Sequence, residues 1–258
     1  MTSPSDTSPR TLQAGELTVR INDTAADLGR DAAAVVADAL NAAIAARGEA
    51  RAILATGNSQ FPLMEALADH DIAWDKVTAF HMDEYLDISD DHPASFRRWM
   101  RERVAEGLGV KQMHYINGNA DPEEECARYE ALLREAPIDL TCMGIGENGH
   151  LAFNEPYDAK FDDPRLANVI TLNAESRAQQ VGEGHFPDDA SVPQYAISLS
   201  IPALVQAETV VVSAPEQRKA KAVRAALNDE ISTACPATYL RTVGNATLFL
   251  DAESASLL

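Results

Sequence analysis

The chain contains little cysteine and no long apolar run. Its three cysteines, Cys126, Cys142 and Cys235, lie far apart and form no CxxC pair. This excludes a disulfide framework and is typical of a reducing cytoplasm. No apolar run approaches the ~20 residues of a membrane span, and the polar start "MTSPSDTSPR" lacks the apolar stretch of a secretory signal. We therefore expect a cytoplasmic protein without membrane contact.

Lysine is also scarce, with only Lys76, Lys111, Lys160, Lys219 and Lys221 in 258 residues. The formal net charge is -19 and the pI is about 4.6. Because phosphate backbones require a basic face, nucleic acid is excluded as a partner. An acid-rich, lysine-poor composition fits either a high-salt cytoplasm or a GC-rich genome.

Apolar runs of strand length alternate with segments of helical spacing along most of the chain. Residues 1–14 are predicted to be a disordered lead-in, and residues 15–258 to form one domain. Strands are expected at 17–23, 50–56, 76–82, 138–146, 168–173, 207–214 and 245–250, and helices at 24–48, 61–70, 92–109, 122–136 and 215–229. This alternation predicts an α/β fold: a mostly parallel, Rossmann-like sheet with helices on both faces.

Ligands of such sheets bind beyond the carboxyl ends of the parallel strands. The first polar strand end is "ATGNSQ", in which Gly57 permits close backbone approach. Thr56, Asn58 and Ser59, together with the following helix start, can donate to an anion. Taken alone, this motif is better interpreted as an ordinary strand-to-helix turn, because it matches neither the Walker A loop nor the GxGxxG fingerprint.

The second strand end, "FHMDEYLD", places Asp83 and Glu84 side by side. Neighbours on an extended segment point in opposite directions, so one of them is expected to face a site. A partly desolvated carboxylate there can act as a general base, and a solvated acidic loop is the alternative. His81 and Asp83 lack a third metal ligand, so we expect no metal.

The third strand end, "GIGENGHLAFNEP", is more specific. Its glycines suit a tight turn from which His150 projects, and imidazole titrates in the range that suits proton transfer. Asn148 and Glu155 are candidates to hold the ring, as an orienting group does in a catalytic triad. A lone histidine is more often structural, but the glycine-rich frame favours a catalytic role here.

A late helix start, "EQRKAKAVRAAL", supplies a cation. Lys219 can reach an anion as a point charge, whereas Lys221 is expected on a solvated helix face. The least regular part of the chain, within residues 157–194, is a candidate lid or binding loop.

Together, "LATGNSQ", "FHMDEYLDISDDHPASF" and "GIGENGHLAFNEP" resemble the glucosamine-6-phosphate deaminase (isomerase) family, which shares a superfamily with 6-phosphogluconolactonases. The resemblance spans nearly the whole chain. The "AFNEP" ending favours the deaminase branch, because lactonases typically carry a Ser-Leu-Phe-Pro ending there. The resemblance implies a hydrolase of amino-sugar and N-acetylglucosamine catabolism that converts D-glucosamine 6-phosphate and water to D-fructose 6-phosphate and ammonia, without a cofactor.

The resemblance also implies individual roles. His150 would open the sugar ring and Glu155 would orient it, with Asn148 beside them, while Asp83 would move the C2 proton to C1. Thr56, Gly57, Asn58 and Ser59 would form the phosphate loop, and Lys219 would bind the phosphate. The partner is thus a small amino-sugar phosphate, and the chain would be a monomer or a homo-oligomer.

The sequence departs from the family pattern at several positions. Gln60 replaces a frequent proline, and Asn148 stands where many members have aspartate. In "ESRAQQVGEGHFPDD", Arg177 matches one family arginine but a second, phosphate-binding arginine has no match, so Arg177 or His185 is expected to compensate. Asn168 and Ile170 replace a basic allosteric cluster, which predicts no activation by N-acetylglucosamine 6-phosphate.

Three alternatives remain open. The altered lid is compatible with the same chemistry on another amino-sugar phosphate, such as galactosamine 6-phosphate. A 6-phosphogluconolactonase is disfavoured by "AFNEP". A non-catalytic sugar-phosphate sensor is disfavoured because the chain has neither a helix-turn-helix segment nor a basic surface, and a sensor has no need of both Asp83 and His150.

Overall fold

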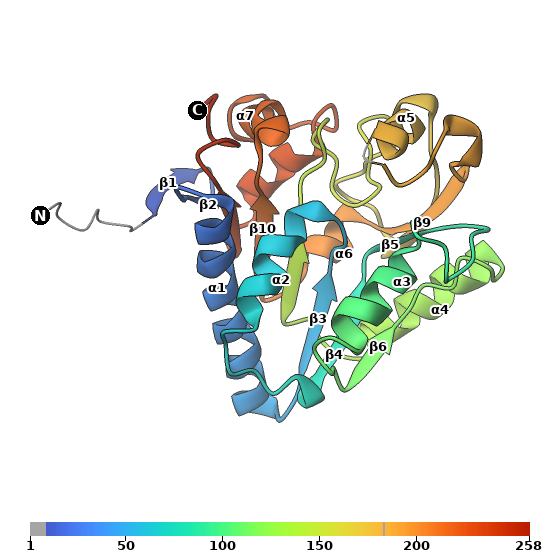
Figure 1. The fold of residues 1–258 in the computed structure, drawn as a ribbon, viewed down its shortest axis with the longest axis horizontal. Coiled ribbons are helices and arrows are strands. Elements are labelled where there is room, and N and C mark those ends of the chain that lie inside the picture. The colour runs from blue at the N-terminus through green and yellow to red at the C-terminus, as the bar shows by residue number, and fades with distance from the viewer. Residues whose placement is uncertain (1–8, 183) are drawn as a thin grey trace, which may run out of the picture.

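The computed structural model describes residues 9–182 and 184–258, and an eight-stranded sheet forms its centre (Figure 1). The strand order is β1-β2-β11-β10-β7-β3-β4-β6. Only β1 and β2 pair antiparallel, and all other neighbours are parallel. The strands are β1 (Arg10–Ala14), β2 (Leu17–Ile21), β3 (Ala50–Leu54), β4 (Val77–His81), β6 (Gln112–His114), β7 (Leu140–Met143), β10 (Thr209–Ala214) and β11 (Ala246–Leu250). The predicted mostly parallel sheet is confirmed.

Helices cover both faces of this sheet, and each face has its own buried apolar cluster. The helices are α1 (Ala25–Arg47), α2 (Phe61–Leu67), α3 (Phe96–Met100), α4 (Pro122–Arg134), α5 (Ala174–Gly182), α6 (Ile201–Val205) and α7 (Ala220–Asn228). Residues of α1, α2 and α3 pack with Val211 of β10, whereas residues of α4, α6 and α7 pack with Val210 and Val212. Successive side chains of a strand point to opposite faces, so a continuous apolar strand serves both layers.

A second sheet of three antiparallel strands, in the order β5-β9-β8, was not anticipated. It contains β5 (Asp83–Tyr85), β8 (Ala167–Thr171) and β9 (Tyr195–Leu199). The strand predicted at 168–173 therefore belongs outside the parallel sheet. Its partner β9 returns directly after the lid segment, and antiparallel pairing needs no crossover helix.

The predicted lead-in of residues 1–14 is too long, because Arg10–Ala14 forms β1. Both faces of this edge strand are largely exposed, which explains its polar sequence, and its backbone groups pair with β2. The remainder of that lead-in, residues 1–8, lies outside the described residues.

Short helical turns connect the main elements. The helix predicted over 92–109 begins only at Phe96, because Ser95 is its N-cap, and it continues as a π-helical turn. The late helix is similarly preceded by a 3₁₀ turn. These turns are η1 (Asn58–Gln60), η2 (Trp74–Lys76), η3 (Arg101–Ala105, π-helical), η4 (Asp189–Ser191), η5 (Gln217–Lys219) and η6 (Pro236–Thr242). Within the described ranges, no helix has the length and apolarity needed to cross a bilayer.

Candidate active site

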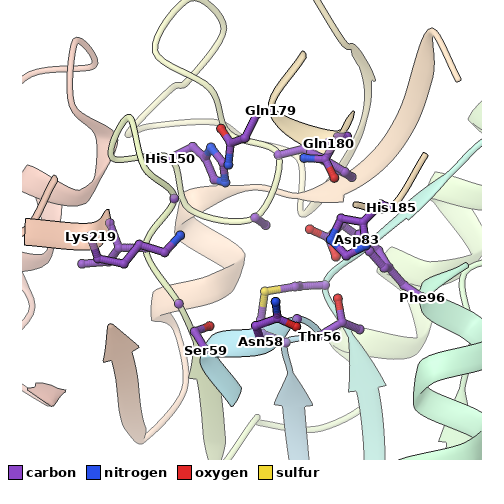
Figure 2. Close-up of a pocket in the computed structure, with 18 of the residues that line it drawn as sticks. Thr56, Asn58, Ser59, Asp83, Phe96, His150, Gln179, Gln180, His185 and Lys219 are labelled. Carbon is purple, nitrogen blue, oxygen red and sulfur yellow. The ribbon is translucent and has the colours of Figure 1, made fainter. Parts of the chain in front are cut away.

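The polar strand ends predicted from the sequence line one cavity at the carboxyl edge of the sheet. Strands β10, β7, β3 and β4 are consecutive neighbours, so their following loops meet there. The space inside, counted together with its open mouth, is about 760 Å³. The cavity is lined by Ala55, Thr56, Gly57, Asn58, Ser59, Met82, Asp83, Phe96, Gly144, Ile145, Gly146, His150, Ala152, Phe153, Gln179, Gln180, His185, Arg218 and Lys219 (Figure 2).

The loop after β3 forms the floor of the cavity in Figure 2, with Thr56, Asn58 and Ser59 in a row. Gly57 has φ +96°, a left-handed conformation that glycine adopts without strain. Buried Gln60, the residue that departs from the family pattern, donates from Nε2 to Ser59 Oγ at 3.0 Å. Because Ser59 Oγ accepts this hydrogen bond, its own hydroxyl proton can be donated to another acceptor, such as an anion.

Two glycines of the loop after β7 are required by close contacts. A Cβ on Gly144 would lie 2.8 Å from Ser59 Oγ, and a Cβ on Gly146 would overlap the imidazole of His150. The phosphate-type loop and the histidine are therefore packed directly against this glycine backbone. Any larger residue at either position would displace a cavity-lining side chain.

His150 is held from behind by a carboxylate, as the sequence predicted. Its Nδ1 lies 3.1 Å from Oε1 of Glu155, which is buried. The distance is that of an ion pair, although the angle is too oblique for a regular hydrogen bond. Catalytic bonds are often loosely aligned before substrate binds. The imidazole ring of His150, which carries Nε2 as its second nitrogen, lines the cavity.

Asn148 does not hold the ring directly, in contrast to one expectation. Its Nδ2 donates to Oε2 of Glu155 at 2.7 Å, and its Oδ1 accepts the backbone N–H of His150 at 3.1 Å. Burial by itself would raise the pKa of Glu155, but the contacts from His150, Asn148 and Ser176 outweigh it and hold that pKa below its ordinary value. Glu155 therefore stays ionised behind the imidazole.

Asp83 and Glu84 point in opposite directions, as alternation along a strand predicted. Asp83 lines the cavity on a different wall from His150 (Figure 2). Burial, reinforced by the charge of Glu84, raises the pKa of Asp83 to about 8. A carboxylate of this kind is a much stronger base than an exposed aspartate, and it is a suitable proton acceptor from carbon.

Glu84 is structural. Its carboxylate accepts bonds from Ser95 Oγ at 2.9 Å and from the backbone N–H groups of Phe96 and Arg97 at 3.1 and 2.7 Å. The Arg97 guanidinium also lies 3.3 Å away. Glu84 thus satisfies the start of α3, whose Phe96 lines the cavity.

Lys219 enters the cavity from the end of η5, and Figure 2 shows its amino group directed toward the interior. Its neighbour Arg218 also lines the cavity, a residue that the sequence reasoning missed, and it pairs with Glu216 and Glu147 at 2.6 and 3.4 Å. Glu216 adopts φ +80°, a strained conformation for a residue with a side chain. Its N–H donates to Asp251, which holds the turn in place.

The structure does not bring Arg177 to the cavity. Its guanidinium lies 3.1 and 3.2 Å from the two carboxylate oxygens of Asp189, within the lid segment. This bidentate pair replaces the predicted contact with substrate phosphate. The lid instead contributes Gln179, Gln180 and His185 to the cavity.

Phe186 anchors the lid segment. It is buried against Tyr85, with ring centroids 5.2 Å apart, and against His92 at 5.4 Å. Gln180 accepts a hydrogen bond from the Tyr85 hydroxyl. In the sequence, an apolar residue, Phe186, directly follows the polar His185, and this pair could have indicated an anchored lid. The sequence does not show that Phe186 would pack against Tyr85. Glu183 of the predicted lid lies outside the described residues.

The donor set of the cavity is suited to acid–base chemistry on an anionic ligand. In the described part of the chain, no group of three His, Cys, Asp or Glu side chains is arranged to hold a metal. The cavity combines an imidazole and a separate buried carboxylate, which are able to transfer protons, with a polar loop and a lysine, which are able to bind an anion. The three cysteines are buried free thiols, and burial raises the pKa of Cys142 to about 12, so it is not a nucleophile.

Comparison with known proteins defines the class. The family model of glucosamine-6-phosphate isomerases/6-phosphogluconolactonase matches residues 23–249. The chain therefore belongs to this family of enzymes.

Individual relatives are more specific. The chain is 37% identical over 209 residues, 80% of each chain, to a glucosamine-6-phosphate deaminase of Exiguobacterium sibiricum. It is 36% identical over 205 residues to one of Bacillus cereus, covering 79% of this chain and 76% of that one. A solved monomeric glucosamine-6-phosphate deaminase superposes with TM-score 0.82 at 31% identity, covering 93% of this chain and 99% of the other. A Thermotoga maritima 6-phosphogluconolactonase, at 18% identity and TM-score 0.73 over 91% and 99% of the two chains, shares the fold.

Proposed function

We propose that this protein is a glucosamine-6-phosphate deaminase, which converts D-glucosamine 6-phosphate and water to D-fructose 6-phosphate and ammonia. The observation that carries the proposal is the pairing, in one cavity, of a carboxylate-held imidazole and a separate buried carboxylate. An aldose–ketose isomerisation of a cyclic amino sugar requires two such groups, because ring opening and carbon deprotonation occur at different atoms.

The phosphate of the substrate is bound, in this proposal, by Lys219 and the loop from Thr56 to Ser59. Both line the cavity, and the loop lies at the start of a helical segment, where the first N–H groups have no partner within the helix and can donate to an anion. Arg218 lies beside Lys219 in the cavity lining, but its charge is paired with Glu216 and Glu147. Arg177 has no part in this site because Asp189 holds it.

His150 opens the ring by moving the proton of the anomeric hydroxyl to the ring oxygen. Glu155 keeps the imidazole oriented and stabilises the imidazolium formed on the way, and Asn148 orients Glu155. The open-chain form has an aldehyde at C1, which makes the C2 proton acidic.

Asp83 then removes the C2 proton and returns it to C1. The intermediate is an enolamine, and protonation at C1 yields an imine at C2. Water adds to this imine and ammonia leaves, which gives fructose 6-phosphate. Hydrolysis of the imine completes the reaction and needs no organic cofactor or metal.

The proposal extends to the setting of the enzyme. We infer a role in N-acetylglucosamine catabolism in the cytoplasm, supported by the cysteine usage noted above. A relative with the same printed activity is described as monomeric, and monomer is the state we infer for this chain.

The first experiment compares ammonia release by the purified protein and by Asp83→Asn. Glucosamine 6-phosphate, galactosamine 6-phosphate and 6-phosphogluconolactone are supplied in parallel, the lactone assayed by acid release. We expect ammonia from glucosamine 6-phosphate and a kcat about 10²- to 10⁴-fold lower in Asp83→Asn, with KM little changed. Asp90→Asn, an exposed carboxylate in the following loop, is the matched control.

Each other outcome has a defined meaning. Ammonia only from galactosamine 6-phosphate would transfer the proposal to that sugar. Lactone hydrolysis without ammonia would replace it with the lactonase. Binding of the sugar phosphates without turnover would indicate a sensor.

A further inference from the structure

Gln180 is a buried side chain of helix α5 that lines the cavity, and the proposed mechanism does not use it. Its side-chain carbonyl oxygen, Oε1, accepts a hydrogen bond from the hydroxyl of Tyr85. Its backbone carbonyl accepts the N–H of His185, which lies just beyond the helix, at 3.1 Å. Gln180 is therefore held at both its main chain and its side chain.

Tyr85 is a rigid support for this amide, because it is fully buried at the end of β5. Its ring contacts three aromatic rings at centroid distances of 5.0, 5.4 and 5.2 Å, those of Phe96, Phe153 and Phe186. A buried tyrosine hydroxyl requires a hydrogen-bond partner, and the Gln180 carbonyl provides one. The bond determines the orientation of the amide, since a hydroxyl proton is accepted by Oε1 and not by the NH₂ group.

The NH₂ group of this amide is left for a ligand. Among the described residues, none accepts a hydrogen bond from Gln180 Nε2, yet the nitrogen is not sealed in the interior, so it is open to the cavity. Figure 2 shows Gln180 on the side of the cavity opposite the floor that Thr56, Asn58 and Ser59 form. A donor that is already oriented loses little conformational freedom on binding, which makes it effective in recognition.

The proposed mechanism leaves two hydroxyls of the substrate without a partner. His150 acts on the C1 hydroxyl and the ring oxygen, and Asp83 acts at C2, from which the amine leaves. Lys219 and the loop of residues 56–59 bind the phosphate on C6. The hydroxyls on C3 and C4 remain. A phosphate held at the floor directs the sugar toward the opposite wall, where Gln180 lies.

We propose that Gln180 binds the sugar by donating from Nε2 to the hydroxyl oxygen on C3 or C4, and that Tyr85 is a positioning residue that fixes the amide in the donating orientation. The proposal rests on the proposed deaminase function and deepens it, because it assigns the part of the sugar that the acid–base groups do not contact. Tyr85 acts through Gln180 and does not touch the sugar.

The first variant removes the donor. Gln180→Met keeps an unbranched side chain of similar length but has no N–H group. We expect kcat/KM for glucosamine 6-phosphate to fall roughly 3- to 10-fold, the range of a lost hydrogen bond between neutral groups. The inhibition constant of inorganic phosphate should stay unchanged, since phosphate binds at the other side of the cavity. Gln194→Met, at an exposed glutamine of the same lid segment, is the matched control.

Deoxy sugars identify the hydroxyl that Gln180 contacts. Wild-type protein should discriminate against 3-deoxy- or 4-deoxyglucosamine 6-phosphate, and Gln180→Met should lose most of that discrimination for one of the two sugars. Loss with the 4-deoxy sugar would assign C4, the carbon at which glucosamine and galactosamine differ, and loss with the 3-deoxy sugar would assign C3. Equal discrimination by wild type and Gln180→Met against both sugars would overturn the proposal.

Tyr85→Phe tests the positioning role. It leaves Gln180 in place but removes the hydroxyl that fixes its amide, so it should weaken discrimination against the same deoxy sugar, which a merely structural role would leave unchanged. The double variant with Gln180→Met should be no worse than the more impaired single variant, because both changes act on one contact. Losses that add would contradict the positioning role. Tyr195→Phe, at an exposed tyrosine, is the control.

Failure of the proposed function would be recognised separately. Wild-type protein that releases no ammonia from glucosamine 6-phosphate would refute the deaminase. Calorimetric titration of wild type and Gln180→Met with glucosamine 6-phosphate and its deoxy forms would then still measure the contact. Equal affinities in the two proteins, or no binding at all, would refute the role of Gln180.

Discussion

Adjacent carboxylates have different environments in this protein, and the environment decides their roles. Glu84 accepts four donors around the start of α3. Asp83, one residue earlier, faces the cavity, and burial raises its pKa. A carboxylate thus serves as a structural anchor at one position and, in the proposed mechanism, as the base at the next, because strand neighbours face opposite sides.

The pKa of Asp83 predicts how the rate depends on pH. A base must be ionised, and a raised pKa means that the ionised form is lost as pH falls through about 8. We therefore expect kcat/KM, which reports the ionisation of the free enzyme, to fall roughly tenfold per pH unit below that value. The measurement is the pH profile of kcat/KM with glucosamine 6-phosphate. A profile that stays flat well below this pH would show that Asp83 is ionised there or is not the base.

Lys219 predicts an effect on binding. Its replacement in Lys219→Met removes a charge-assisted hydrogen bond worth about 1.5–3 kcal/mol, which corresponds to a KM roughly 10- to 100-fold higher. Steady-state kinetics with glucosamine 6-phosphate measure it, and Lys221→Met, at an exposed position two residues later, should behave as wild type. An unchanged KM in Lys219→Met would place the phosphate elsewhere.

At the scale of elements, short helices and turns position the site more than the long helices do. Helix α3 has only five residues, and an isolated helix of that length is not stable in water. Its first N–H groups bond to Glu84 rather than to solvent. The side chain of Glu84 thereby couples α3, and with it Phe96, to the strand that carries Asp83.

Removal of this coupling should be strongly destabilising. Glu84→Leu leaves the buried guanidinium of Arg97 without its carboxylate, and breaking a buried pair from one side costs about 3–5 kcal/mol. Urea unfolding followed by circular dichroism measures the loss. Glu102→Gln is the control, because Glu102 forms an exposed pair with Arg98 and such pairs contribute within about 1 kcal/mol. Equal losses in the two variants would contradict the structural role of Glu84.

At the scale of the whole molecule, the strand order gathers the site. Strands β3, β4, β7 and β10 come from distant parts of the chain, and their adjacency brings four loops to one edge. The small antiparallel sheet lies beside this edge and supports the lid (Figure 1). The cavity is therefore shared by both sheets.

The structure also predicts kinetics without cooperativity or activation by an anionic effector. Asn168 donates to Asp163 at 3.0 Å and Ile170 is buried, so neither position supplies a cation for an anionic effector. We expect hyperbolic dependence of rate on glucosamine 6-phosphate, unchanged by N-acetylglucosamine 6-phosphate except for competition at the active site. Rate measurements across a titration of that compound check this, and cooperative activation would contradict it.

The sequence by itself determined the alternation of strands and helices, and with it the parallel sheet and three of its polar strand ends. Glycine patterns and apolar runs carry that information, because secondary structure depends largely on residues that are close together in the sequence. It also identified the motifs around Asp83 and His150. Sequence spacing did not reveal the second sheet, since β8 and β9 pair across the lid segment.

Only the tertiary structure decided which side chains share the cavity. Arg177 fitted a motif, yet Asp189, twelve residues later, holds it away. Gln60 supports Ser59, and Asn148 acts on Glu155 rather than on the ring. Such contacts depend on distances of a few ångströms between loops that are far apart in sequence, and the packing of the folded chain alone sets those distances.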